Sequence, residues 1–236
     1  MPETFVLIPG AWHGGWASRP VAERLRLAGH RVLTPTLPGL ADGDDPTRYH
    51  LRDVVDFVVE LVERKDLRDV TLVGHSWGGY PLTGAANRLT SRLRKAVYWS
   101  AFVPADGACL LDEVPPPYVE LFTQLAEASG NDSVSMPFEV WQSAFMNDAS
   151  AEVQRLVHEL LVPQPMSYFR ETVTPLDGSI ERSYVLPTED VALPPGEFAW
   201  APRFPERLGV PLIETPGSHE ACFTRPAELA EALLKA

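Results

Sequence analysis

Cysteine is scarce in this chain, with only Cys109 and Cys222 among 236 residues. The two lie far apart in the sequence, so we expect free thiols, as in a protein of the reducing cytoplasm. The chain has no close cysteine pair and no H-E-x-x-H pattern, either of which would indicate a zinc site. We therefore predict a cytoplasmic protein that uses neither a metal nor another cofactor.

Basic residues are also few relative to acidic ones. The 20 Lys and Arg face 32 Asp and Glu, for a formal net charge of -12, which argues against a nucleic-acid or anionic membrane partner. No apolar run is long enough to cross a bilayer, and the start, Met1 to Thr4, leads straight into a strand-like run, so we expect no secretory signal. The expected partner is a small molecule. The oligomeric state stays open, with a homodimer among the candidates.

The glycine-rich turns do not have the pattern of a nucleotide-binding loop. Gly10-x-x-x-Gly14-Gly15 and Gly74-x-x-x-Gly78-Gly79 differ from G-x-G-x-x-G, and no Lys-Ser or Lys-Thr pair ends a phosphate loop. The sequence therefore argues against a dinucleotide-binding domain.

Hydrophobic residues make up 45% of the chain, enough to fill the core of one large α/β domain. In the first hundred residues, buried-strand runs alternate with amphipathic helical stretches, which predicts a parallel sheet covered by helices on both faces. The strand runs are 5–8, 32–34, 70–73 and 96–99, and the helical stretches are 18–28, 51–64 and 79–89.

This rhythm breaks after residue 103. Amphipathic pieces follow near 119–128, 138–146 and 151–161, before strand runs return at 183–186 and 211–214 and a final helix at 227–235. A long helical excursion of this kind is typical of a lid over the sheet edge. We predict one domain over 1–236, with a core at 1–103 and 181–236 and an inserted helical cap at about 104–180.

The sequence Gly74-His75-Ser76-Trp77-Gly78 has the pattern G-x-S-x-G between a strand and a helix. In that context, the turn presents a strained serine above the sheet. Ser76 is the candidate nucleophile, and the Trp77 N–H is a candidate donor to a developing oxyanion. The alternative is a glycine-rich turn whose serine has no chemical role.

A serine nucleophile needs a base and an acid, which in such folds follow later strands in the order Ser, acid, His. His219 follows the last strand run and is the candidate base. Asp190 follows the preceding run and is the candidate acid that fixes the histidine tautomer. Glu189, beside it, and Asp106, in a turn after the earlier strand, remain alternative acids.

The loop after the first strand, rich in glycine and aromatic residues, is expected to complete the site. Gly10 allows a close backbone approach, and the Ala11 N–H is the candidate second oxyanion donor. His13 is either structural or in contact with substrate. The candidate substrate contacts come from this loop and from the cap, and the alternative for the cap aromatics is that they form the core of the cap. The candidates are Gly10, Trp12, His13, Trp141, Phe145 and Phe169.

These motifs together, Ile8 to Trp16, Gly74 to Gly79 and Gly217-Ser218-His219, resemble the α/β-hydrolase superfamily. Within it, the chain is similar to the branch of plant methyl-ester esterases and hydroxynitrile lyases and their bacterial relatives. The resemblance implies a six-stranded parallel sheet of order 2-1-3-4-5-6 with a helical cap. It also implies Ser76, Asp190 and His219 as the triad, and Ala11 and Trp77 as oxyanion donors; the Asp190-to-His219 spacing favours Asp190 over Glu189.

Two departures from the lyases bear on the reaction. This chain has Gly10 where the lyases have a threonine, and Glu220 where they have a lysine that stabilises cyanide. An acidic residue there has the opposite electrostatic effect. We therefore predict a serine hydrolase that cleaves a small-molecule ester, with thioesters and lactones as further candidates. An acyltransferase using the same triad and a receptor-like ligand-binding module are the alternatives.

Overall fold

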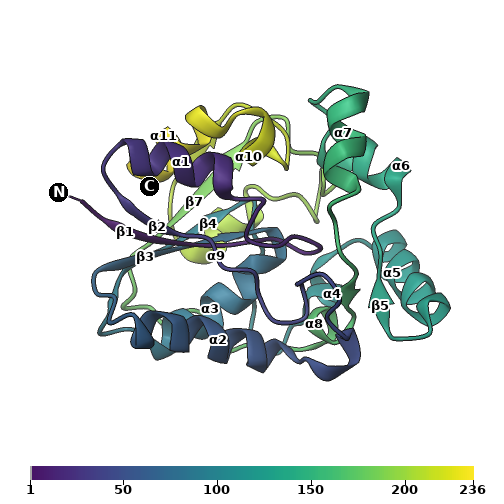
Figure 1. The fold of residues 1–236 in the computed structure, drawn as a ribbon, viewed down its shortest axis with the longest axis horizontal. Coiled ribbons are helices and arrows are strands. Elements are labelled where there is room, and N and C mark those ends of the chain that lie inside the picture. Colours follow the sequence, from purple (N-terminus) through teal and green to yellow (C-terminus); the bar gives the residue numbers. More distant parts are fainter. Residues whose placement is uncertain (1) are drawn as a thin grey trace.

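The computed structural model describes residues 2–236, which form a six-stranded parallel sheet covered by helices on both faces (Figure 1). The strand order, β2-β1-β3-β4-β7-β8, equals the predicted order 2-1-3-4-5-6, because β7 and β8 are the fifth and sixth strands of this sheet. The predicted fold class is therefore confirmed. The strands are β1 (Thr4–Ile8), β2 (Arg31–Leu33), β3 (Val70–His75), β4 (Leu93–Trp99), β7 (Arg182–Pro187) and β8 (Leu212–Thr215).

The central strands are apolar throughout because helices cover both faces of the sheet. In β1, Phe5 and Leu7 point to one face and Val6 and Ile8 to the other, so the strand contributes to two separate hydrophobic clusters. Helices α1, α10 and α11 pack on the first face, and α2, α3 and α9 on the second (Figure 1). Their bounds are α1 (Arg19–Leu27), α2 (Leu51–Arg64), α3 (Gly79–Arg88), α9 (Arg203–Leu208), α10 (Ala221–Thr224) and α11 (Pro226–Lys235).

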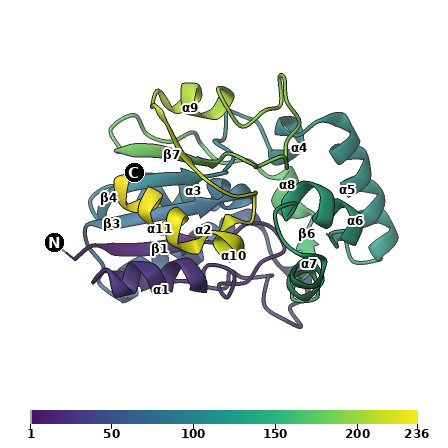
Figure 2. The ribbon, with the colours of Figure 1, turned by 90° about the horizontal axis from the view of Figure 1, so that it is seen from above.

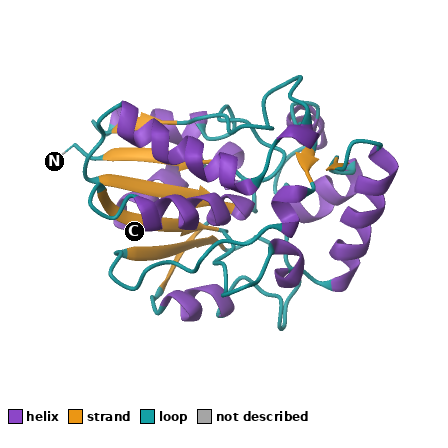
Figure 3. Ribbon diagram, turned by 90° about the horizontal axis from the view of Figure 1, so that it is seen from below, coloured by secondary structure: helices purple, strands orange, loops and turns teal. Residues whose placement is uncertain are grey.

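The segment between β4 and β7 lies to one side of the sheet, at the end opposite the N-terminus (Figures 1 and 2). It contains a small antiparallel pair, β5 (Ser133–Val134) and β6 (Gln164–Pro165), visible as the two short arrows apart from the main sheet in Figure 3. We call this segment the cap. Its helices are α4 (Leu110–Glu113), α5 (Pro116–Ser129), α6 (Phe138–Val140), α7 (Ala151–His158) and α8 (Ser167–Arg170), with a π-helical turn at Trp141–Phe145.

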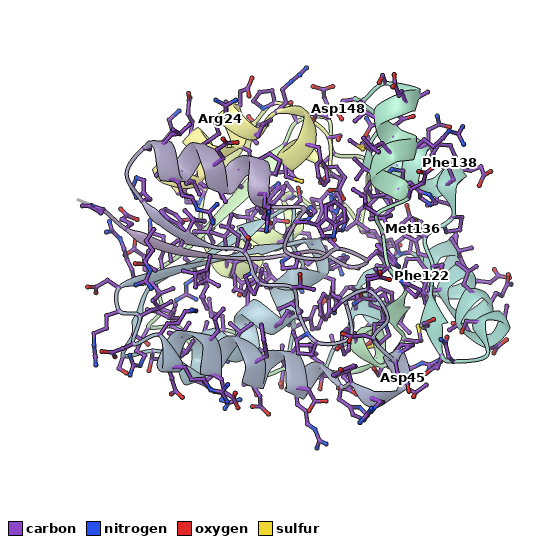
Figure 4. All side chains as sticks on the ribbon, in the orientation of Figure 1. Arg24, Asp45, Phe122, Met136, Phe138 and Asp148 are labelled. Carbon is purple, nitrogen blue, oxygen red and sulfur yellow. The ribbon has the colours of Figure 1, made fainter. Side chains whose placement is uncertain are left out.

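Side chains from the cap continue the hydrophobic core of the sheet. Phe122 of α5, labelled in Figure 4, is 4% exposed and belongs to the same cluster as Val6 and Ile8 of β1. Cap and sheet are therefore packed as one core rather than joined by a loose hinge.

No helix within residues 2–236 has the length and apolar character needed to span a bilayer.

A buried carboxylate ties the base of the cap to α9. The Glu113 side chain is 3% exposed and pairs with Arg203 and with Arg207, whose Nη1 donates to Glu113 Oε1 at 2.6 Å. Arg203 also donates to the Glu113 carbonyl oxygen at 2.8 Å. Because both cations converge on one carboxylate, its removal would leave partly buried positive charge without compensation.

We expect Glu113→Ala to lower the free energy of unfolding by about 3–5 kcal/mol, the usual cost of removing one partner of a buried ion pair. Urea denaturation monitored by circular dichroism measures this loss. Asp56→Ala is the matched control, since Asp56 and Arg88 form a half-exposed pair and such pairs contribute less than about 1 kcal/mol. Equal effects of the two substitutions would contradict a structural role for Glu113.

Candidate active site

Ser76 stands at the end of β3 in a strained backbone conformation. Its φ is +53°, in the left-handed region that a serine rarely adopts. A 3-10 turn over Ser76–Gly78 leads from it into α3, and the Phe102 N–H donates to the Ser76 carbonyl at 3.1 Å. This is the strand–turn–helix geometry that the G-x-S-x-G pattern predicts.

The serine turn packs closely against the loop that follows β1. A Cβ atom on Gly78 would lie 2.6 Å from the Pro9 carbonyl oxygen, and one on Gly10 would lie 2.9 Å from His75 Nδ1 and 3.1 Å from Ser76 Cβ. Real Cβ atoms do not sit at 2.6 Å or 2.9 Å from such atoms, so glycine is needed at both positions. The two predicted oxyanion donors, Ala11 and Trp77, belong to these two segments, and both residues line the cavity beside Ser76.

His219 follows β8 and is hydrogen-bonded to Asp190, which follows β7. The distance from His219 Nδ1 to Asp190 Oδ2 is 2.8 Å, and both side chains are buried. The other Asp190 oxygen accepts from the Ala192 N–H at 3.0 Å and from Trp200 Nε1 at 2.9 Å. Three donors therefore hold the carboxylate, and it in turn sets Nδ1 of His219 as the protonated nitrogen.

The alternative acids lie elsewhere. Glu189 is exposed, with its backbone N–H donating to the Gly217 carbonyl at 2.9 Å, and Asp106 is exposed in the turn before Gly107. Of the three candidate acids, Asp190 alone is hydrogen-bonded to His219 within the described residues.

Packing fixes the His219 ring on several sides. Trp200 stacks on it at 5.4 Å between ring centroids, and Phe145 meets it edge-on at 5.2 Å. His75 lies at 4.6 Å, and its Nε2 donates to the His219 carbonyl oxygen at 3.0 Å. His219 Nε2 is buried and makes no hydrogen bond within residues 2–236. Because His219 lines the same cavity as Ser76, this nitrogen is available to accept a proton.

The charges around His219 favour its protonated form. Burial by itself lowers the pKa of the imidazole, but Asp190, through its charge and hydrogen bond, and the Glu220 carboxylate outweigh it and raise the pKa above 6.5. Burial, with the neighbouring His219 and His13, instead holds the pKa of His75 well below that value, so His75 is neutral and acts through its N–H.

Glu220, at the position of the lyase lysine, is not among the residues that line the cavity. It is 1% exposed, with its carboxylate 3.6 Å from His13 Nε2 and 3.6 Å from Cys222 Sγ. His13 in turn donates from Nδ1 to the Ala11 carbonyl at 2.6 Å. A buried polar group of His13, Glu220 and Cys222 therefore lies behind the site, between the loop after β1 and the His219 loop.

A cavity of about 370 Å³, including its mouth, opens beside Ser76 and His219. Of the predicted substrate contacts, Trp12, Phe145 and Phe169 line it, whereas Gly10, His13 and Trp141 are outside its wall. The remaining lining residues belong to no motif that predicts them. They are mainly apolar and lie in the cap or after β4 and β7. They are Phe102, Leu110, Val114, Tyr118, Phe122, Ala192, Leu193 and Trp200.

The cavity wall carries no Asp, Glu, Lys or Arg. Its three tryptophans use their indole N–H groups inside the protein, since Trp12 donates to Val134, Trp77 to Tyr168 and Trp200 to Asp190. They therefore present only apolar ring surface. Apart from Ser76 and His219, the polar side-chain atom of the wall is the Tyr118 hydroxyl.

Within residues 2–236, the only group of side chains with metal-ligand geometry is His75, His219 and Glu220, whose candidate ligand atoms lie within 4.8 Å of one another. Two of their ring nitrogens are already bonded, His75 Nε2 to a carbonyl and His219 Nδ1 to Asp190. We interpret the group as part of the hydrogen-bonded support of His219.

Comparison with curated proteins identifies relatives of similar length, one of them named as an esterase. The chain is 34% identical to the carbendazim hydrolyzing esterase of Nocardioides sp. (strain SG-4G), with 97% of each chain covered. It is 29% identical to salicylic acid-binding protein 2 of Nicotiana tabacum, with 98% of this chain and 95% of the relative covered.

Among solved structures, an extracellular α/β-hydrolase from a Paenibacillus species superposes with a TM-score of 0.93 at 32% identity, covering 100% of this chain and 99% of that one. That hydrolase is described as sharing structural and functional homology with tobacco salicylic acid binding protein 2. The profile of the Alpha/beta hydrolase family matches residues 5–232. The chain therefore belongs to the alpha/beta hydrolase family.

Proposed function

We propose that this protein is a serine ester hydrolase in which Ser76, His219 and Asp190 form the catalytic triad. The observation that carries the proposal is the orientation of His219. Asp190 holds its Nδ1 at 2.8 Å, while its unbonded Nε2 belongs to a ring that lines the same cavity as Ser76. A neutral histidine with a free Nε2 beside a strained serine is the arrangement that acyl transfer requires.

In the first half of the reaction, His219 Nε2 takes the hydroxyl proton of Ser76 as Oγ bonds to the ester carbon. The carbonyl π electrons move to oxygen, where the N–H groups of Ala11 and Trp77 stabilise the oxyanion. Collapse breaks the bond to the alkoxy oxygen, which leaves as the alcohol with the proton from His219. Water then repeats the sequence against the acyl-enzyme and releases the acid.

The wall of the cavity defines the substrate class. Among residues 2–236, its lining includes no Asp, Glu, Lys or Arg, and its rings come from both the core and the cap. A neutral, flat acyl group is stabilised there by burial and ring contacts, whereas a second carboxylate would lose its hydration without a partner. We infer esters of uncharged aromatic or similarly apolar acids. The 34% identical relative is named for hydrolysing carbendazim.

The arrangement around Gly10 favours hydrolysis over cyanohydrin cleavage. Any side chain at this position would press on the His75 ring, which stacks on Trp99 at 4.0 Å and cannot yield easily. The lyase threonine therefore has no room in this chain, and Glu220 supplies no positive charge to the cavity. The cytoplasmic location remains a prediction that belongs to this proposal, and the oligomeric state stays open, with a homodimer among the candidates; one related hydrolase is described as extracellular.

Ser76→Ala and His219→Ala should each reduce kcat for p-nitrophenyl acetate by about 10³–10⁶-fold, because triad members act as one unit. The double variant should lose little more than either single one. Steady-state kinetics measure these effects, and a fluorophosphonate should label the wild type but not Ser76→Ala. Turnover that survives both substitutions would place the reactive site elsewhere.

Glu220→Gln should move the rise of kcat/KM with pH to lower pH. The base must be neutral to act, so activity rises with pH through the raised pKa of His219, and removing the Glu220 charge lowers that pKa. Because Glu220→Gln leaves the triad intact, kcat measured at pH values above this rise should stay within about tenfold of wild type. Loss of a general base, by contrast, lowers the rate by ~10²–10⁴-fold.

The control for this charge change is Glu214→Gln, on the exposed part of β8. Its pH profile should coincide with that of the wild type. A Glu220→Gln profile that also coincides, or that shifts to higher pH, would contradict the electrostatic role of Glu220.

Methyl benzoate should be hydrolysed with a kcat/KM at least about a hundredfold above that of monomethyl terephthalate, since burying an unpaired carboxylate costs several kcal/mol. The two esters share the scissile bond and the ring, so the comparison isolates the added charge. Similar values for both would mean that the acyl group does not enter the apolar cavity.

A further inference from the structure

The backbone of Trp12, in the loop after β1, is held in an unfavourable conformation. Its φ is +65°, in the left-handed region that a bulky residue adopts only when its surroundings enforce it. Trp12 directly follows Ala11, so the Ala11–Trp12 peptide adjoins the Gly10–Ala11 peptide, whose N–H is the proposed oxyanion donor. The contacts that hold Trp12 therefore restrain the backbone on one side of that donor.

The groups that hold Trp12 come from the cap. Its N–H donates to Gln164 Oε1 at 3.0 Å, its carbonyl accepts from the Val162 N–H at 2.9 Å, and its indole Nε1 donates to the Val134 carbonyl at 2.8 Å. All three partners belong to β5, β6 or the segment entering β6, more than a hundred residues along the chain.

The peptide unit that joins Ala11 to Trp12 is fixed at both of its polar atoms. Its N–H donates to Gln164 at 3.0 Å, and its carbonyl oxygen accepts from His13 Nδ1 at 2.6 Å. A peptide held on opposite sides cannot rotate about its axis without breaking both bonds. The conformation of Ala11 is therefore set by one contact within its own loop and one from the cap.

The Gln164 side chain is fully buried and bonds to the β1 loop through its oxygen. Oε1 accepts from Trp12, whereas Nε2 bonds to no other residue within 2–236. Because the Trp12 N–H is a donor, the oxygen must be the atom that faces it, so the unbonded atom is the nitrogen.

We propose that Gln164 is a positioning residue: from the cap, it fixes the Ala11–Trp12 peptide and so helps to hold the adjoining Ala11 N–H in the oxyanion site. The proposal rests on the proposed hydrolase function. Gln164 does not line the cavity, so it acts through the loop and not by touching substrate. The cap thus supplies the alignment of the donor as well as the wall of the acyl pocket.

Gln164→Leu tests this role. We expect kcat for methyl benzoate to fall about 10²–10³-fold, the usual effect of losing one oxyanion donor, while KM changes by less than about threefold because the wall is intact. At this fully buried position a carboxyl group stays neutral, because burial disfavours its charged form, so Gln164→Glu keeps a carbonyl oxygen acceptor and replaces the NH₂ group by a hydroxyl. It should recover most of the lost kcat.

Gln154→Leu is the matched control. Gln154 is another buried glutamine of the cap, but its side chain bonds to Met146 and Gln142 and not to the β1 loop. It should lower the melting temperature and leave kcat within about threefold of wild type, since it removes no transition-state contact. If Gln164→Leu does not fold, Gln164→Asn, which withdraws the oxygen by one methylene, gives the decisive kcat.

The outcomes distinguish a failure of the proposed hydrolase function from a failure of the positioning role of Gln164. An inactive wild type, or full activity in Ser76→Ala, overturns the proposed function whatever Gln164 does. An active wild type with unchanged kcat in Gln164→Leu or Gln164→Asn overturns the positioning role alone. The same holds if KM and kcat move together, or if Gln164→Glu is as impaired as Gln164→Leu.

Discussion

The hydrogen bond between Asp190 and His219 is the contact on which the rest of the site depends. It joins the loops after β7 and β8, two neighbouring strands, so the register of these strands brings Asp190 and His219 together. Trp200 and Ala192 hold the Asp190 carboxylate, and His75, Phe145 and Trp200 hold the His219 ring. With so many restraints, the imidazole needs little reorganisation before it can accept a proton. Cap residues extend this support, since Asp148, labelled in Figure 4, accepts from the Ser218 N–H at 3.2 Å and from Thr224 Oγ1 at 2.6 Å.

Local sequence patterns predict the core of the fold and the identity of the family, and both predictions are confirmed. Apolar runs and helical periodicity are properties of contiguous residues, so β1, α2 and β3 can be read directly from the chain. The G-x-S-x-G turn is equally local. Ser76, Asp190 and His219 lie at the strand ends that the pattern assigned to them, and their catalytic roles stay predictions until the variants are measured.

The remainder of the site depends on contacts between distant residues. Nothing around Gln164 in the sequence indicates a partner at Trp12, and nothing around Glu220 indicates that its side chain turns towards His13 and not into the cavity. The β5–β6 pair has two residues in each strand, too few for a recognisable alternation. Tyr118 and Phe122 lie on the same side of α5 with stacked rings, but which face of the helix meets the cavity is decided by tertiary packing.

The three hydrogen bonds between Trp12 and the cap have a consequence for re-engineering this chain. A cap that both shapes the acyl pocket and braces the β1 loop cannot be exchanged as an independent module. A chimaera that grafts a foreign cap onto this core would inherit a new specificity but lose the brace, unless the graft also brings an acceptor to the position of Gln164. Substrate range is then easier to alter by replacing single rings of the pocket than by swapping the whole insertion.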